Sequence, residues 1–369
     1  LTYQAIGAGL GINEIFGPSA AGKVWSEDII NTGDFTSYGV YSDMDYQLNE
    51  RWGFTAGLRY SRDEKDFSWE IKERSFGQSM PGLTDFLFPL LPRLDANNSW
   101  SKVTGRAVTR YQINDNNMIY LSYSTGYKSG GYDSLDPGSS IRPFAPEEVK
   151  NLELGYKADL WQQVRLQLVA FDMDLTNRQR SVSSKTPDSG VAIPLVINGD
   201  QDIRGMEMVL DWQATQQLKL GLVTEYRKTE SKWQEFYNAD GELVTDVDKA
   251  STADAYTLTA DWTAAQQWAG GYWKLHLDYV YEENTRADDP DLLEIAKSIP
   301  VYFADTKTIN ARLSWNSSDD QWELALWGKN LADHETTGGI GGFAADTLGT
   351  PITSLNAPRT YGVEVKYQF

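Results

Sequence analysis

Two residues of the sequence have the types and spacing of a catalytic pair. His276 and Asp278 are two positions apart, so on a strand both side chains would lie on one face. A histidine oriented by a carboxylate is the base of a Ser-His-acid hydrolytic site, but that chemistry also needs a serine adjacent in space. The sequence places no such serine, so we expect no enzyme activity. A hydrolase site built into the wall of a β-barrel is the alternative that His276 leaves open.

Clustered carboxylates are the second kind of residue that could do chemistry. Asp133 and Asp136 form one group, and Asp288, Asp289 and Asp291 form another. Such groups suit Ca²⁺, a hard cation that prefers oxygen ligands. The second group lacks the spacing of an EF-hand loop, so solvated acid is the simpler interpretation. The chain has no Cys, which argues against thiolate metal sites. We predict no metal site and no cofactor.

Ligand recognition is the chemistry that the long connections between strands favour. They carry aromatic side chains, which suit a planar or catecholate ligand when a few polar groups accompany them, and arginines that can pair with an anion. The alternative is that these aromatics pack within the loops or at a membrane interface. The predicted ligand-binding residues are Tyr127, Tyr132, Arg142, Phe144, Arg178, Trp233, Tyr237, Tyr302 and Phe343.

Composition limits the classes of protein that this chain can belong to. Its formal charge of −19 disfavours a nucleic-acid partner, because contact with phosphates requires Lys and Arg on the binding face. Mean hydropathy is −0.48, and no run of 18 apolar residues exists, which excludes a membrane protein built from helices. A membrane β-barrel is still allowed, because only alternate residues of each strand face lipid.

The last nine residues show the pattern that organises the chain. Apolar side chains fall on one face of a strand and polar side chains on the other, because side chains alternate with a period of two. A soluble sheet could hold this strand at its edge, and a barrel would use it as the closing strand. The predicted barrel-closing residues are Tyr361, Val363, Val365, Tyr367 and Phe369.

The same alternation recurs as hairpins with short turns on one side and long connections on the other. We expect 13 or 14 strands, many of them longer than those of soluble proteins, in a transmembrane antiparallel β-barrel. A large soluble β-sandwich or propeller is the alternative. Residues 11–33 and 72–97 are expected to be irregular, and the other long connections are expected at about residues 131–147, 179–200, 232–250, 284–301 and 333–357. The predicted hairpins cover 34–48 with 52–61, 99–113 with 117–130, 148–160 with 163–178, 201–214 with 217–231, 252–264 with 271–283, and 303–316 with 320–332.

Position within these strands predicts two further sets of residues. Tryptophans beside the short turns share the apolar face, which predicts an aromatic girdle at one membrane interface. The girdle residues are Trp52, Trp212, Trp262, Trp315 and Trp322. Charged residues share the opposite face, which predicts a solvated interior wall. The wall residues are Arg59, Arg106, Glu153, Lys157, Glu207, Lys219, Glu225, Asp261, Lys274, Asp278, Arg312, Glu323, Lys329, Glu364 and Lys366.

Four segments, in this order along the chain, resemble a known family. They are SYGVYSDMDYQLNERWGFTAGLRYSRDEKDF (37–67), YLSYSTGYKSGGYD followed by FAPEEVKNLELGYKADL (120–160), WELALWGKNLADHE (322–335) and YGVEVKYQF (361–369). Together they resemble the β-barrel of TonB-dependent outer-membrane receptors, most closely the siderophore receptors. His334 follows the third motif and is expected in a loop rather than as a ligand.

The resemblance implies a 22-stranded barrel in the bilayer of the cell outer membrane, with a plug domain inside it and energy supplied by the TonB–ExbB–ExbD complex. It implies active uptake of a scarce small molecule, with a ferric siderophore as the commonest substrate of the family. We expect residues 1–369 to be a C-terminal part of such a barrel without its plug. The alternatives are a self-contained 14-stranded barrel, whose last strand would pair with residues 1–9, and a passive porin-like or fatty-acid-type channel.

Overall fold

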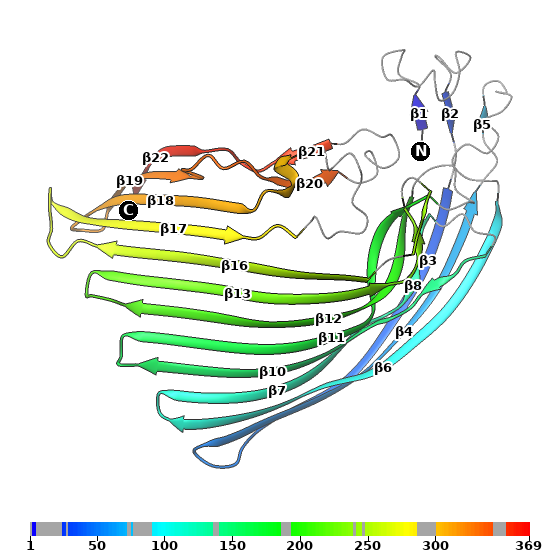
Figure 1. The fold of residues 1–369 in the computed structure, drawn as a ribbon, viewed down its shortest axis with the longest axis horizontal. Coiled ribbons are helices and arrows are strands. Elements are labelled where there is room, and N and C mark those ends of the chain that lie inside the picture. The colour runs from blue at the N-terminus through cyan, green and yellow to red at the C-terminus, as the bar shows by residue number, and fades with distance from the viewer. Residues whose placement is uncertain are drawn as a thin grey trace.

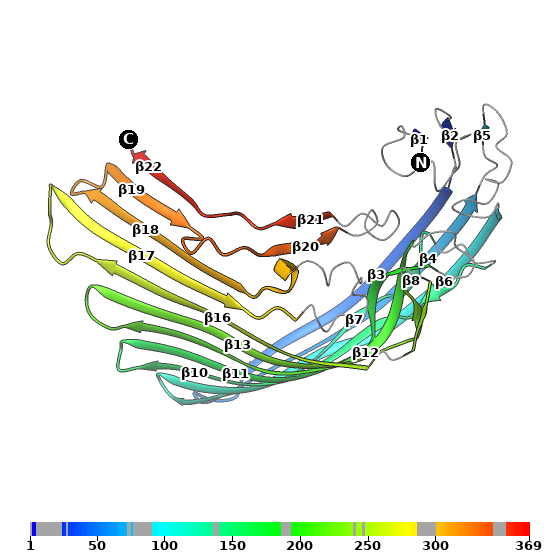
Figure 2. The same cartoon turned by 45° about the horizontal axis from the view of Figure 1, so that its top comes forward.

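One long antiparallel sheet forms most of the protein. The computed structural model describes residues 2–4, 24–26, 29–71, 75–76, 91–135, 140–185, 193–238, 241–245, 248–285, 300–341 and 352–369. Within them, 13 strands pair in the order β22-β19-β18-β17-β16-β13-β12-β11-β10-β7-β6-β4-β3. The sheet curls into a trough whose two edges are β3 and β22 (Figures 1 and 2). Successive strands of the sheet are therefore neighbours, as in an up-and-down barrel wall.

The strands of the sheet are up to 24 residues long, far beyond the roughly 5–6 residues of an ordinary soluble strand. Their bounds are β3 (Ile29–Gln47), β4 (Trp52–Ile71), β6 (Leu91–Asn114), β7 (Asn117–Lys128), β10 (Glu147–Leu160), β11 (Val164–Ser184), β12 (Ile193–Gln213), β13 (Leu218–Trp233), β16 (Asp248–Thr263), β17 (Gly271–Glu282), β18 (Thr306–Ser317), β19 (Trp322–Lys329) and β22 (Thr360–Tyr367).

Shorter elements accompany the sheet. A three-stranded sheet joins β1 (Thr2–Gln4), β2 (Val24–Ser26) and β5 (Ser75–Phe76). Three two-stranded pieces join β8 (Gly131–Tyr132) with β9 (Pro143–Phe144), β14 (Phe236–Tyr237) with β15 (Leu243–Val244), and β20 (Thr337–Gly341) with β21 (Ile352–Leu355). A short 3₁₀ helix covers Pro300–Phe303. In the part of the chain that the structure describes, no helix has the length and apolar character needed to cross a membrane.

All the short connections lie at one end of the trough, which we call the turn end, and the opposite end is the loop end (Figure 1). Side-chain oxygens stabilise several of these turns. Asn49 Oδ1 accepts the backbone N–H groups of Arg51 and Trp52, and Thr215 Oγ1 accepts those of Gln217 and Leu218, just before and at the start of β13. Asn and Thr side chains favour such turns because they replace a backbone acceptor locally.

The predicted hairpins are confirmed, but several boundaries were wrong. β3 begins at Ile29 and β6 begins at Leu91, inside segments that we expected to be irregular. Residues 179–200, expected as a loop, instead extend β11 to Ser184 and β12 back to Ile193. Of residues 1–9 the structure describes only 2–4, and these do not pair with β22, because β22 pairs with β19 and β1 pairs with β2.

The strand register places charge and apolar side chains on opposite faces of the sheet. Asp261, His276 and Arg312 stand side by side on three neighbouring strands, and all the predicted wall residues share their face. On the other face, one row across four strands consists of Leu166, Leu210, Leu222 and Leu258. The two-faced strands predicted from alternation are therefore present throughout the sheet.

Few of the apolar side chains of the sheet are buried in a core. Leucine, valine and aromatic residues of the apolar face are largely exposed, among them Leu58, Val103, Leu154, Met206 and Leu326. The larger of two small buried clusters lies at the loop end and contains Phe67, Trp69, Ile71 and Ile193. A continuous exposed apolar face of this extent needs apolar surroundings, which a lipid bilayer provides.

Candidate functional site

Ion pairs between strands, some of them reaching over an intervening strand, line the charged face of the sheet. Arg106 on β6 reaches Asp43 on β3 at 2.8 Å, passing over the intervening strand β4. The reach is possible because β4 presents Gly57 at this point, where a Cβ would lie 2.9 Å from Asp43 Oδ2. At the other edge, Arg312 contacts Glu323 at 2.7 Å and Glu364 at 3.1 Å. Because the side chains of these ion pairs are partly exposed, water reaches the charged face. Each ion pair therefore contributes little to the stability of the fold.

The predicted catalytic candidate is part of this wall. His276 Nδ1 lies 2.7 Å from Asp261 Oδ1, and its Nε2 lies 3.5 Å from Asp278 Oδ1. Asn310 Nδ2 in turn donates to Asp278 at 2.7 Å. Both ring nitrogens therefore face carboxylates, which holds the ring but leaves neither nitrogen directed at a serine. The geometry fits a wall contact and not a hydrolytic site.

A bulge changes the direction of the β11–β12 hairpin near its loop end. The register slips by one residue between Leu175 and Arg178, where Asn177 adopts a left-handed conformation with φ 53°. Beyond the bulge, residues 178–184 and 193–199 form what we call the hairpin arm. Its Ile193, only 1% exposed, packs with Phe67 and Trp69 of β4, although four strands separate β12 from β4 in the sheet. The arm thus leans over the concave side of the trough (Figure 1).

Hydrogen bonds fix residues 129–135 and 140–147, which contain β8 and β9, to the hairpin arm. The Asn198 side chain accepts the backbone N–H of Ala145 at 2.9 Å and donates to the carbonyl of Ala145 at 3.2 Å. Gln179 Nε2 donates to the carbonyl of Ser129, and Asp133 Oδ1 accepts the N–H of Val196. Amide side chains thereby pair backbone groups that have no ladder partner. The arm and these residues form one rim structure.

A cation–aromatic stack occupies the arm. The guanidinium carbons of Arg178 and Arg180 lie 5.7 and 5.2 Å from the centre of the Trp233 ring. Trp233 is 5% exposed and packs on Gly199, where a Cβ would lie only 2.5 Å from its Cε3 atom. Arg178 also donates to Gln201 Oε1 at 2.6 Å. Two cations are therefore held over one fixed ring by stacking.

A second aromatic cluster lies beside the first core. The ring of Tyr132 stacks on Phe67 at 5.3 Å and meets the edge of Trp100 at 6.2 Å. Lys65 Nζ lies 5.7 Å from the Trp100 ring centre and donates to the carbonyl of Gly130 at 2.7 Å. Burial, followed by the charge of Asp66, raises the pKa of Tyr132. Its hydroxyl is buried and has no hydrogen-bond partner among the described residues.

The structure brings only some of the predicted ligand-binding residues together. Arg178 and Trp233 are in contact, and Tyr132 and Phe144 lie on the paired strands β8 and β9, but Arg142 is exposed beside β9. The remaining members lie elsewhere on the loop end or outside the described residues. Tyr127 is the second-last residue of β7, Tyr237 is in β14, Tyr302 packs edge-on against Phe303 in the 3₁₀ helix, and Phe343 lies outside the described residues.

Sequence reasoning missed Arg180, Lys65 and Trp100. Arg180 follows Arg178 at a spacing of two, which would have placed both on one strand face had residues 179–200 not been assigned to a loop. Lys65 and Trp100 come together only through the pairing of β4 with β6 and the position of residues 129–135. No signal in the sequence reveals that contact.

The predicted girdle tryptophans lie on the apolar face at the turn end. Two of them pack against aromatic residues of the next strand, Trp52 against Tyr111 and Trp322 against Tyr367, each with ring centres 4.6 Å apart. Trp212, Trp262 and Trp315 occupy the same face of their strands. Their role at a membrane interface remains a prediction.

The predicted closing strand is the edge strand β22. The side chains of Tyr361, Val363, Val365 and Tyr367 share the apolar face and are exposed, and Phe369 follows at the turn end. Among the described strands β22 pairs with β19 alone. Its role in closing a barrel remains a prediction.

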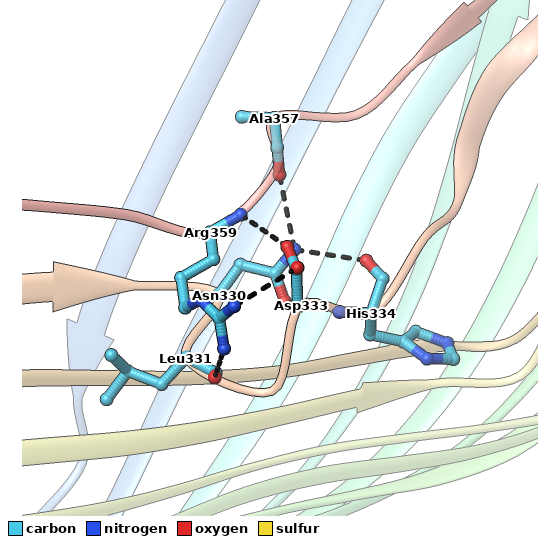
Figure 3. Close-up of polar contacts among 6 residues, drawn as sticks. All are labelled: Asn330, Leu331, Asp333, His334, Ala357 and Arg359. Carbon is cyan, nitrogen blue, oxygen red and sulfur yellow. Dashed lines mark hydrogen bonds and ion pairs between the residues drawn. The ribbon is translucent and has the colours of Figure 1, made fainter.

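The WGKNLADHE motif forms a hydrogen-bonded turn that connects the end of β19 to the start of β22 (Figure 3). Asn330 is 8% exposed; its amide nitrogen donates to the carbonyls of His334 and Ala357, and its oxygen accepts the N–H of His334. Asp333 accepts the backbone N–H of Arg359 at 2.9 Å. The motif is therefore a structural clasp, and His334 lies in the loop, as predicted.

The carboxylate clusters do not form a metal site in the described part of the chain, where no group of three or more His, Cys, Asp or Glu side chains is arranged to bind a cation. Asp133 instead accepts a backbone N–H, as described above. Asp136, Asp288, Asp289 and Asp291 lie outside the described residues.

Comparisons with known proteins agree with this architecture. The family model described as "TonB dependent receptor-like, beta-barrel" matches residues 1–331. The pesticin receptor of Yersinia pestis is 24% identical over 185 residues, which are 47% of this chain and 23% of that protein. The chain thus spans less than a quarter of the length of this curated relative in the matched region.

Solved structures show the same fold. The ferric yersiniabactin uptake receptor of Yersinia pestis superposes with a TM-score of 0.65 at 16% identity, covering 94% of this chain and 49% of that chain. The copper transporter OprC superposes with a TM-score of 0.62 at 14% identity, covering 91% of this chain and 49% of that chain. In both cases the match spans about half of the longer protein.

Proposed function

Because this chain belongs to the TonB-dependent receptors, outer-membrane β-barrel proteins that act as transporters and not as enzymes, we propose that it serves the active uptake of a scarce solute, an iron chelate of the siderophore class. The assignment to outer-membrane transport rests on the family. The ferric siderophore is supported by relatives: the similar structures include a ferric yersiniabactin receptor, although a copper transporter is also among them.

The observation that carries the proposal is the two-faced sheet. Its apolar face fits the hydrocarbon of the outer membrane, where each strand needs about 9–11 residues to cross. Its ion-paired concave face fits a water-filled interior through which a solute can move. The turn end would then face the periplasm and the loop end would face outward, where the hairpin arm and the aromatic residues beside it, such as Trp233, would meet the ligand.

Energy would come from the TonB–ExbB–ExbD complex of the inner membrane through a plug domain in the barrel. Ion pairs such as Arg106–Asp43 and Arg312–Glu364 line the wall that such a plug would contact. Exposed pairs of this kind exchange partners at low cost, because each contributes roughly 1 kcal/mol or less. A wall lined with such weak ion pairs would allow a plug domain to move without a large loss of free energy.

Uptake of radioactive iron tests the proposal. The receptor that carries this chain would be expressed in a Gram-negative host lacking its own siderophore receptors, with and without TonB, and supplied with defined iron chelates. We expect uptake of at least one chelate that requires both the receptor and TonB. Uptake that is unchanged without TonB, together with steady single-channel conductance of the purified protein, would show a passive channel instead.

A further inference from the structure

Five basic side chains lie on the apolar face of the sheet, at its border toward the loop end. On β4, β10, β12, β13 and β18, this face carries only uncharged side chains from the turn end until it reaches a cation. On β11 and β16 an aspartate stands near the same level. The chain has 52 acidic and 33 basic residues, so composition does not account for a level that is mainly basic. We call the five cations the basic belt: Arg62, Lys150, Arg204, Lys228 and Lys307.

The members of the basic belt lie at one height although they are not in one row of the ladder. Counted from the row of Lys307, the row of Arg204 and Lys228 is four residues nearer the loop end. Lys150 is six residues nearer, and Arg62 is ten residues nearer after nine strand-to-strand steps. At roughly 3.3 Å per residue and 4.8 Å per strand, this drift is a slope of about 37°. Barrel strands tilt by roughly 35–45° from the barrel axis, so the belt runs level around the wall.

An acidic layer lies directly beyond the basic belt. On or beside each of the five strands, the next position of this face toward the loop end carries a carboxylate. These residues are Glu64, Glu148, Asp202, Glu230 and Asp305. Lys228 lies 2.5 Å from Glu230, and Arg62 lies 2.8 Å from Glu64. The acids therefore draw the charged heads away from the apolar face, while the apolar stems of these long side chains stay beside it.

The cations of the belt are accessible to a further partner. Their side chains are 46 to 66% exposed, and ion pairs with this exposure are weak. Arg204 and Lys228 stand directly opposite each other on neighbouring strands, and such like-charge pairs are unfavourable. Arg204 also contacts Asp172 at 3.2 Å. Two adjacent cations match the oxygens of one phosphate group, which makes stronger contacts than an exposed carboxylate pair.

The opposite border of the apolar face has no basic belt. In the described strands, the positions of this face nearest the turn end carry the girdle tryptophans and other uncharged residues. One border is therefore uncharged and aromatic, and the other is basic. This asymmetry fits a bilayer that presents anionic groups on the side of the loop end, because Lys and Arg near such a surface gain electrostatic attraction.

From this arrangement we propose that the basic belt binds the phosphate groups of phosphorylated lipids in the leaflet that borders the loop end, and thereby sets the depth of the barrel in the membrane. The belt adjoins the lipid-facing surface, so the anion that reaches it is attached to an acyl chain that covers that surface. The acidic layer repels phosphates farther out, which restricts them to the level of the belt. The proposal goes beyond solute uptake and does not depend on the identity of the solute.

Equilibrium binding of two glycolipids to the purified receptor in detergent provides the test. The probes are lipid A, which carries two phosphates, and the same lipid with both phosphates removed. The variants are Arg204→Gln, Lys228→Gln and their combination. Arg227→Gln is the matched control, because Arg227 is the neighbour of Lys228 on β13, lies on the charged face and pairs with Glu225 at 3.1 Å.

We expect the wild-type receptor to bind lipid A more tightly than its dephosphorylated form, and this comparison requires no variant to fold. Each single change in the belt should weaken lipid A binding on the order of fivefold, as expected for one cation near an anionic surface. Binding of the dephosphorylated lipid, and the effect of Arg227→Gln on either lipid, should change less than twofold. Equal affinity of the wild type for both lipids, or equal weakening by Arg227→Gln and Lys228→Gln, would overturn the proposal.

Glu230→Gln separates lipid binding from a purely structural ion pair. This change removes the carboxylate that competes with phosphate for Lys228, so lipid A should bind a few times more tightly. If the Lys228–Glu230 pair only held the fold together, loss of either partner would have the same effect. Weakening of lipid A binding by Glu230→Gln to the same extent as by Lys228→Gln would therefore show that the belt is structural and does not bind lipid.

Discussion

Replacing Asn330 by Ala should destabilise the hydrogen-bonded clasp that connects β19 to β22. The Asn330 side chain makes three hydrogen bonds, two to His334 and one to Ala357, at 2.9 to 3.2 Å. At about 1 kcal/mol net for each bond, their loss costs about 3 kcal/mol. Asn330 has φ 49°, a left-handed conformation in which Ala adds about 1 kcal/mol more. The expected destabilisation of the clasp is therefore about 4 kcal/mol.

Asn330→Gly is the matched control, because Gly accepts a positive φ without strain but makes none of the three hydrogen bonds. It should lose about 3 kcal/mol, roughly 1 kcal/mol less than Ala, from the same hydrogen bonds. Urea unfolding of the reconstituted receptor gives the free energy of unfolding, and hydrogen exchange of the segments 330–336 and 356–362 reports the clasp locally.

Exchange of these two segments should accelerate together in both variants. The reasoning would be refuted if Asn330→Ala shifted the free energy of unfolding by less than about 0.5 kcal/mol, the usual range of a neutral surface change, with exchange in both segments unchanged. It would also fail if Gly were as destabilising as Ala, because the strain would then be absent.

Three further changes follow from contacts at the loop end. Tyr132→Phe removes a buried hydroxyl without a partner among the described residues, so the free energy of unfolding should stay unchanged or rise by up to about 1 kcal/mol; a clear loss would reveal a partner. Asn198→Ala should speed hydrogen exchange at Ala145 and its neighbours, because it removes both hydrogen bonds between the Asn198 side chain and the Ala145 backbone. Unchanged exchange would show that these two bonds are not needed to hold this segment. The N–H of Asn284 lowers the pKa of Asp305, so acid below about pH 4 should loosen the β17–β18 loop in the wild type; Asp305→Asn should abolish this pH dependence of exchange.

The lowered pKa of Asp305 determines in which direction the stability of the β17–β18 loop changes with pH. A carboxyl with a depressed folded pKa contributes stability above its unfolded pKa and loses it as the pH falls through the folded value. Because Asp305 is deprotonated throughout the neutral range, no change is expected between pH 6 and 8. Loosening of the loop in that range would contradict the assignment.

The sheet was predictable because its residues are two-faced. Strand alternation such as Leu218, Lys219 and Leu220 identifies the face of each side chain without any tertiary information, and turn residues such as Asn49 mark where the strands end. The arm was not predictable in the same way. The bulge at Asn177 interrupts the alternation, so the hairpin beyond it looks like a loop in the sequence.

The candidate site was predicted only in part for the same reason. Arg178 and Trp233 were identified from residue type, but their contact depends on the pairing of Gly199 with both. Tyr132 was identified as well, whereas Trp100 beside it was not, because their contact joins elements that are not neighbours in the register. Residue type indicates which side chains can bind a ligand, and only the fold shows which of them meet.

The central claim is that the apolar face of the sheet contacts lipid while the charged face contacts water. The chain has no Cys, so single nitroxide labels can be attached at Leu222→Cys and Val223→Cys in the reconstituted receptor. Leu222 lies in the outward leucine row, and Val223, its neighbour on β13, is 52% exposed on the charged face. The label at 222 should be relaxed by oxygen dissolved in the bilayer, and the label at 223 by a water-soluble nickel chelate. Water access at 222 with lipid contact at 223, or water access at both, would contradict the account.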